Sequence, residues 1–207
     1  MQAGNRTYST AKDIPDCVPV FPLSGALLLP GGQMPLNIFE PRYLEMIDAA
    51  LRGDRVIGMI QPKFSEDAGN SDRPKLCAVG CLGRVASFAE SGDGRYLVSL
   101  QGICRFRVAE ELNVRSPFRQ CRISPFMSDL DEEGDASSVD REALLRVFRA
   151  YLDANDLEAD WESVKRAGND TLVNALSMMS PYGPAEKQAL LEAPDLKSRA
   201  ETLIADT

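Results

Sequence analysis

The sequence has 207 residues, enough for one large domain or two small ones, and its 44% hydrophobic and 26% charged residues are ordinary for a globular protein. No apolar run approaches the ~20 residues that cross a bilayer, and the first fifteen residues lack the apolar stretch of a secretory signal. These features predict a cytoplasmic protein that does not enter the membrane. The formal charge of −8 makes nucleic acid an unlikely partner, since affinity for polyphosphates comes largely from Lys and Arg.

The start of the chain predicts a leader followed by short, turn-rich β structure. Residues 1–15 are expected to be a flexible leader, and Val18–Tyr43 is an apolar stretch repeatedly interrupted by proline and glycine. Proline removes a backbone donor and glycine allows positive φ, so this stretch cannot be one long element. We expect a first strand near Val18–Leu23, a turn at Pro30–Gly32 and extended structure again over Leu36–Phe39.

A three-turn helix is predicted directly after this stretch, over Pro41–Arg52. Leu44, Ile47 and Leu51 recur at helical spacing, and Gly53 offers a stop. We therefore expect one face of this helix to pack against the sheet.

Beyond the helix the sequence alternates between β-prone segments and turns. We expect an exposed loop over Phe64–Pro74, a bulge near Gly80 and Gly83, a hairpin turn at Ser91–Gly94 and a break between strands at Gly102. Strands are predicted over Val56–Ile60, Leu76–Glu90, Tyr96–Leu100, Cys104–Val108 and Phe118–Phe126. Five or six strands with one helix favour a small closed or nearly closed barrel, because closure removes exposed edges.

Two arginines stand out on one of these predicted strands. Arg105 and Arg107 alternate with the apolar Cys104, Phe106 and Val108. Because side chains alternate between the two faces of a strand, both arginines are expected to point outward into solvent.

The last third of the chain is predicted to be helical. Residues 128–142 carry seven acidic residues and one arginine, and residues 128–138 are expected to form an acidic linker with a solvated surface. Within 139–207, apolar residues at helical spacing, Pro184 at a first helical position and Asp195 at a cap predict a helical subdomain. The barrel subdomain would then cover residues 16–127.

Several spaced motifs resemble the Lon substrate-binding domain, the N-terminal domain of Lon proteases. They occur in order along the chain as Phe21–Leu23, Leu29–Gly31, Pro35–Glu40 with Arg42-Tyr43, Gly80–Val85, Gly102–Val108 and Glu186–Glu192. The resemblance covers roughly residues 16–205. It implies an α+β fold, in which a PUA-like β pseudobarrel with one packed helix is followed by a C-terminal α-helical bundle.

The resemblance also implies a function, which is recognition of polypeptides without catalysis. The ATPase and Ser-Lys peptidase parts of Lon lie outside the matching region, and the sequence contains no Gly-x-x-x-x-Gly-Lys-Ser/Thr phosphate loop. The expected partners are unfolded or extended polypeptide segments, with a protease or chaperone as a further partner. A peptide would add to a sheet edge or settle in a groove between the barrel and the helices.

Two other functions stay open at this stage. PUA-like barrels in other proteins bind RNA, so RNA binding through Arg105, Arg107, Arg119 and Arg122 is one alternative, opposed by the negative charge. An uncharacterised enzyme that uses carboxylates or a cysteine is the other. Histidine is absent and the five cysteines form no paired CxxC, so we expect no metal, no cofactor and reduced thiols mostly in the core.

Phe39, Arg42 and Tyr43 are the candidate peptide-binding residues. Aromatic residues beside an arginine are the types enriched where interfaces concentrate their binding energy. The alternative is structural: Phe39 would anchor the helix to the barrel, Tyr43 would cap that core and Arg42 would pair with Glu40 or Glu45. The absence of an open apolar cleft beside Phe39 and Tyr43 would favour the structural interpretation.

Overall fold

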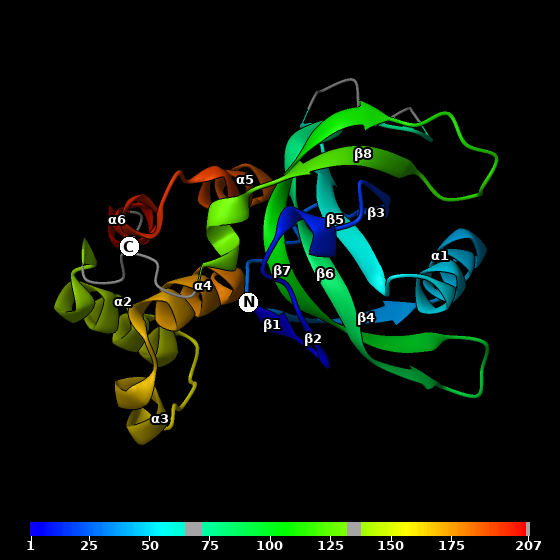
Figure 1. Ribbon diagram of the computed structural model, residues 1–207. Helices are drawn as coiled ribbons and strands as arrows, with labels where there is room; N and C mark the ends of the chain where they lie inside the picture. Colours follow the sequence, from blue (N-terminus) through cyan, green and yellow to red (C-terminus); the bar gives the residue numbers. More distant parts are fainter. Residues whose placement is uncertain (65–71, 132–137, 206–207) are drawn as a thin grey trace.

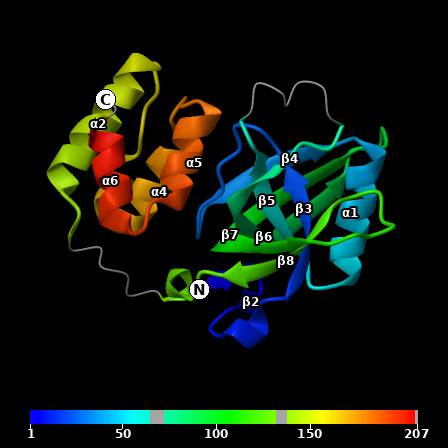
Figure 2. The same cartoon turned by 90° about the horizontal axis from the view of Figure 1, so that it is seen from above.

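The computed structural model describes residues 1–64, 72–131 and 138–205. A β barrel carries one helix on one side and several helices on the opposite side (Figures 1 and 2). Most of the loop expected over Phe64–Pro74 and most of the acidic linker lie outside the described residues.

Five strands close the barrel, and a sixth is attached to its outside. The described strands are β1 (Gln2–Ala3), β2 (Arg6–Thr7), β3 (Cys17–Pro22), β4 (Gln33–Ile38), β5 (Val56–Pro62), β6 (Leu76–Glu90), β7 (Tyr96–Glu111) and β8 (Gln120–Pro125). The large sheet has the order β4-β7-β6-β5-β3-β8, and an additional β7–β8 pairing closes the ring of five. β3 and β5 are parallel, and the other neighbours in this sheet are antiparallel. The closed barrel expected from the strand pattern is confirmed.

The long β6–β7 hairpin differs from the prediction at one residue. β7 runs without a break through Gly102, which was expected to separate two strands. The reason for glycine there is a close crossing, because a Cβ on Gly102 would overlap the carbonyl group of Leu29. The pairing of β6 shifts register between Cys81 and Gly83, in agreement with the bulge expected there.

Helix α1 (Pro41–Arg52) has the bounds that the apolar spacing predicts. Proline occupies the first turn, where its missing N–H costs no hydrogen bond, and Gly53 ends the helix. The helix buries Tyr43, Met46 and Ile47 against the barrel. This packing places the candidate residues Arg42 and Tyr43 at the start of α1, next to strand β3.

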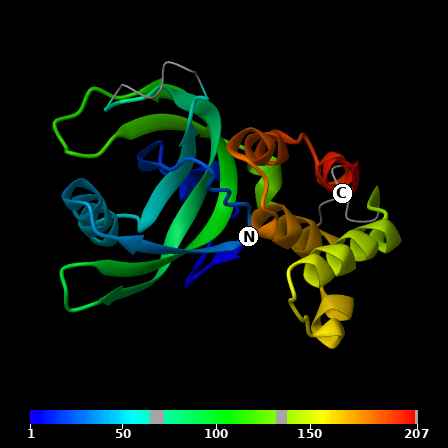
Figure 3. The ribbon, with the colours of Figure 1, turned by 180° about the vertical axis from the view of Figure 1, so that it is seen from behind.

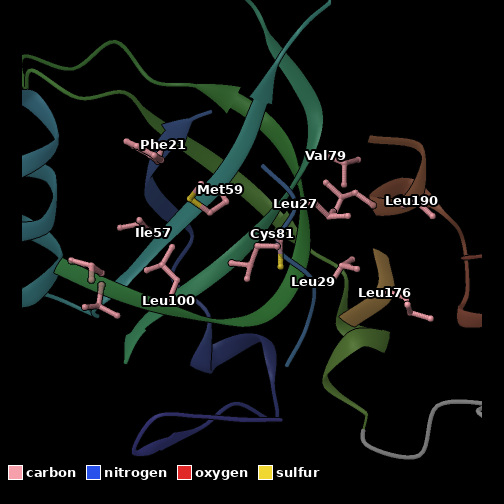
Figure 4. Packing of buried hydrophobic residues seen from close by; sticks show 14 of the residues in the cluster. Phe21, Leu27, Leu29, Ile57, Met59, Val79, Cys81, Leu100, Leu176 and Leu190 are labelled. Carbon is pink, nitrogen blue, oxygen red and sulfur yellow. The ribbon is translucent and has the colours of Figure 1, made fainter. Parts of the chain in front are cut away.

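Two apolar clusters occupy the two faces of the barrel wall. The interior cluster includes Val20, Leu82 and Phe106. Only glycine fits at position 80, because a Cβ there would lie 2.6 Å from the Phe106 ring. The other cluster joins the outer face of the strands to α1 and to the C-terminal helices. In Figure 4, Leu27 and Leu29 lie between the strands and the helices that carry Leu176 and Leu190. The proline- and glycine-rich segment therefore fills the junction between barrel and helices with its own leucines.

The first fifteen residues do not form the flexible leader that their polarity suggested. β1 and β2 make a small hairpin, and the backbone N–H of Gly4 donates to the Gln101 side chain of β7 at 2.9 Å. Ala3 and Tyr8 are completely buried, and Ile14 is 5% exposed. Few apolar side chains fix this segment to the barrel, namely the three buried ones and the partly buried Met1, and they are too few to produce a periodic pattern in the sequence.

Helices follow the barrel over most of the last third of the chain. They are α2 (Arg141–Ala154), α3 (Trp161–Arg166), α4 (Asn169–Met179), α5 (Pro184–Glu192) and α6 (Leu196–Ala205). Asp140 caps α2 and Asp195 caps α6, each accepting a backbone N–H, as expected for N-cap residues. α6 packs against both α2 and α4. The short helix α3 was not predicted, and among the described residues no helix could cross a membrane.

Arg105 joins the barrel to the helices instead of pointing into solvent. Its side chain is 5% exposed and forms a two-pronged ion pair with Asp129 of the 3-10 helix η3 (Met127–Leu130), at 2.8 and 2.9 Å. It also donates to the carbonyl oxygens of Leu191, in the last turn of α5, and of Ala193, directly after that helix, at 3.0 and 2.7 Å. The prediction placed Arg105 on the correct face of β7, but helix α5 covers that face. Arg107, two residues along, is exposed as predicted.

Candidate functional site

A small pocket lies where the start of α1 meets β3 and the segment before β8. It has a volume of about 120 Å³ and is lined by Pro22, Arg42, Tyr43, Pro62, Asp72, Pro74, Pro117, Phe118 and Arg119. The pocket is smaller than the roughly 300–1,000 Å³ typical of sites for cofactors and drug-sized ligands. Its size suits a single side chain, and its lining of four prolines and two aromatic rings suits an apolar one.

Tyr43 forms the inner wall of this pocket. Its ring meets Phe21 of β3 edge to face, with 4.3 Å between ring centroids, and only 8% of the residue is exposed. Burial raises the pKa of the Tyr43 hydroxyl, so the phenol stays neutral. Tyr43 therefore packs in the core, as the structural alternative expected, and it also lines the pocket.

Arg42 lies over the Tyr43 ring at the mouth of the pocket. The guanidinium carbon is 4.7 Å from the ring centroid, and Nε donates to Glu40 at 2.9 Å. The pairing with Glu40 was one of the two that the sequence suggested. Both side chains are more than 40% exposed, so this ion pair contributes little stability and leaves the cation accessible to a ligand.

Phe39 is not an anchor between α1 and the barrel. It is 62% exposed, the largest exposure among the described large apolar residues, and the guanidinium carbon of Arg95 lies 5.9 Å from its ring centroid. Phe39 does not line the pocket beside Tyr43. The structure thus brings Arg42 and Tyr43 together, while Phe39 projects into solvent from the end of β4.

An ion-pair network that sequence reasoning missed supports the outer rim of the pocket. Arg119 binds both carboxylate oxygens of Glu111 at 2.8 and 2.7 Å and donates to the carbonyl of Pro74 at 2.7 Å. Arg73 binds the same carboxylate at 2.6 Å. The bond from Arg119, aided by Arg73, lowers the pKa of Glu111 to about 2. No sequence signal marks this network, because its members come from three separate segments.

The contacts of the arginines argue against the RNA-binding alternative. Arg105 is buried, Arg119 is paired with Glu111, and Arg122 lies 3.6 Å from Glu110. Among the four arginines proposed for RNA, these three already face carboxylates. The described part of the chain also contains no cluster of three or more metal-ligating side chains.

The sequence also suggested that a peptide could bind in a groove between the barrel and the helices. In the structure, side chains of the protein itself fill this space. Leu27, Leu28 and Leu29 are at most 3% exposed there. Gln61 donates to the carbonyl of Pro184, and Gln188 donates to the carbonyl of Val79. These contacts leave the pocket beside Tyr43 as the better candidate.

The family comparisons agree with this architecture. The family model described as the ATP-dependent protease La (LON) substrate-binding domain matches residues 17–205. The chain belongs to this family. Lon protease 2 of Myxococcus xanthus is 28% identical over 204 residues, which cover 93% of this chain and 24% of that protein. The chain therefore spans about a quarter of the length of such relatives.

Two solved structures have the same fold. The Lon N-terminal domain protein of Xanthomonas campestris gives a TM-score of 0.66 at 22% identity, covering 91% of this chain and 97% of that one. The N-terminal domain of Mycobacterium avium complex Lon protease gives 0.69 at 19% identity, covering 91% and 96%. Membership in the Lon substrate-binding family, expected from the spaced motifs, is confirmed.

Proposed function

We propose that this chain is a non-catalytic module that binds unfolded or extended polypeptide segments, and that the pocket beside Tyr43 holds one apolar side chain of the bound segment. The pocket carries the proposal, because its volume of about 120 Å³ and its proline and aromatic lining suit a side chain better than a cofactor. Arg42 at its mouth would contact the polypeptide backbone or an acidic neighbour.

Membership in the substrate-binding family supports the same conclusion. The family name refers to substrate binding, whereas the activity of the full-length Lon proteases is not carried over to a chain that matches a quarter of their length. We propose that the barrel is of the PUA-like type and acts in the cytoplasm. A segment held by this module would be passed to a protease or chaperone.

Binding can be measured with reduced, carboxymethylated α-lactalbumin, a permanently unfolded probe, by fluorescence anisotropy. Arg42→Ala should weaken binding about tenfold if Arg42 at the pocket contributes as an interface hot spot. Phe39→Ala tests whether the bound segment also contacts the exposed ring outside the pocket. Leu157→Ala is the matched control, because Leu157 is also exposed but follows α2, in the helical part of the chain. Absence of binding by the folded wild-type protein would refute the proposal, as would equal affinities of all three variants and the wild type.

A further inference from the structure

Among the described strands, β4 is the one strand of the large sheet that has a single paired neighbour. The ring of five strands closes through the β7–β8 pairing, and β4 pairs only with β7, over Gln33–Ile38. Figure 3 shows β4 on the near side of the barrel, running from the side of the C-terminal helices to the start of α1. A strand with one unpaired side presents backbone N–H and C=O groups to another chain.

The hydrogen bonding next to β4 identifies which groups are unpaired. Gly102 of β7 donates its N–H to the carbonyl of Gly32 at 2.8 Å. In an antiparallel ladder the bonded residues alternate, so Met34 and Leu36 also direct their backbone groups toward β7. Gln33, Pro35 and Asn37 therefore direct theirs away from it, and all three residues are exposed. Pro35 fits this position, because its missing N–H would face away from β7.

The side chains of β4 make it an unusual edge. Native edge strands are commonly protected by charged residues, but β4 contains none, and Pro35 is its only protection. Gln33 and Asn37 keep their outward N–H groups, four residues or about 13 Å apart along the strand. Met34 and Leu36 are half-buried on one face, and the exposed Phe39 directly follows the strand. An uncharged, extended backbone with apolar side chains is the partner that such an edge fits.

We propose that the bound polypeptide pairs as an added strand with the free edge of β4, and this inference rests on the proposed function. Gln33 and Asn37 would donate their N–H groups to the added strand, while Gln33, Pro35 and Asn37 would accept from it. Backbone pairing of this kind depends on an extended conformation of the bound segment and not on its sequence. Unrelated unfolded segments could therefore share one site.

Proline substitution tests the edge without changing the bonds to β7. Asn37→Pro removes one outward N–H, and its control, Asn37→Ala, keeps that N–H while removing the side chain. With reduced, carboxymethylated α-lactalbumin as probe, the proline variant should bind about fivefold more weakly than the alanine variant. Pro35→Ala adds an outward N–H and should bind about fivefold more tightly than wild type. Thermal melting establishes that each variant is folded.

The outcomes separate the two proposals. If wild type binds the probe but Asn37→Pro equals Asn37→Ala and Pro35→Ala equals wild type, strand addition is wrong and polypeptide recognition stands. If wild type does not bind at all, the proposed function fails and the edge inference fails with it. Should Asn37→Pro not fold, the gain expected for Pro35→Ala decides alone, and an unchanged affinity overturns the inference.

Discussion

Removing the carboxylate of Asp129 should destabilise the protein by several kilocalories per mole. Asp129 accepts three hydrogen bonds from Arg105, from the backbone N–H, Nε and Nη2, at 2.8–2.9 Å. The two side chains are only 5% and 10% exposed, so the substitution leaves a guanidinium buried without its counter-charge. Breaking a buried ion pair from one side typically costs about 3–5 kcal/mol. We expect Asp129→Ala to lower the free energy of unfolding by about this amount.

Urea denaturation gives the free energy, followed by far-ultraviolet circular dichroism and by the fluorescence of Trp161. Trp161 is the single tryptophan and lies in α3, so its signal reports the helical part of the chain. Arg107→Met is the matched control, since Arg107 is exposed on the same strand and its loss should change stability by no more than about 0.5 kcal/mol.

A double substitution separates charge from packing in this prediction. Arg105→Met also leaves the carbonyl oxygens of Leu191 and Ala193 without a donor, so it should cost at least as much as Asp129→Ala. Combining Arg105→Met with Asp129→Leu removes both buried charges, and the loss should be clearly smaller than the sum of the single effects. The proposed role of the buried Arg105–Asp129 ion pair would be refuted by a loss of stability below about 1 kcal/mol for Asp129→Ala. Strictly additive effects of the two substitutions in the double variant would refute it as well.

Two further predictions concern titration and thiol chemistry. The pKa of Glu111 is lowered from 4.5 to about 2, so its stabilising contribution is present above about pH 4.5 and is lost as the pH falls through 2. Glu111→Gln should therefore destabilise the protein at pH 7 and much less at pH 2. An equal loss at both values would contradict the Arg119–Glu111 contact. Of the five cysteines only Cys17 is exposed, while burial raises the pKa of Cys104 to about 12. Iodoacetamide at pH 8 should thus modify one thiol in the native protein, and Cys17→Ser should abolish this modification. Rapid modification of more thiols would disprove that the other four cysteines are buried.

Local patterns predicted much of the fold because their signals lie within one segment. The period of apolar residues and the flanking Pro41 and Gly53 gave the bounds of α1, since helical spacing and termination are decided by neighbours in sequence. The same holds for the hairpin turn after β6, where Gly92 and Gly94 adopt positive φ. The pattern also assigned Arg105 to the correct face of β7.

Contacts between distant segments could not be predicted in the same way. Whether Arg105 is buried depends on η3 and α5, which approach it from 24 and 86 residues away in sequence. The candidate site shows the same limit. Arg42 and Tyr43 were named from their residue types, but Phe118 and Arg119 complete the pocket only because β8 closes the barrel beside α1.

The sequence by itself determined the family, the closed barrel and the helical character of the last third of the chain, because spaced motifs and apolar periodicity record which faces must be buried. Only the tertiary structure decided what covers each face: it buried Arg105 and Tyr8, exposed Phe39 and left β4 as an open edge. The physical reason is that burial is a property of packed surfaces. A residue's neighbours in the chain fix the direction of its side chain, whereas elements far away in sequence decide whether that direction leads to solvent.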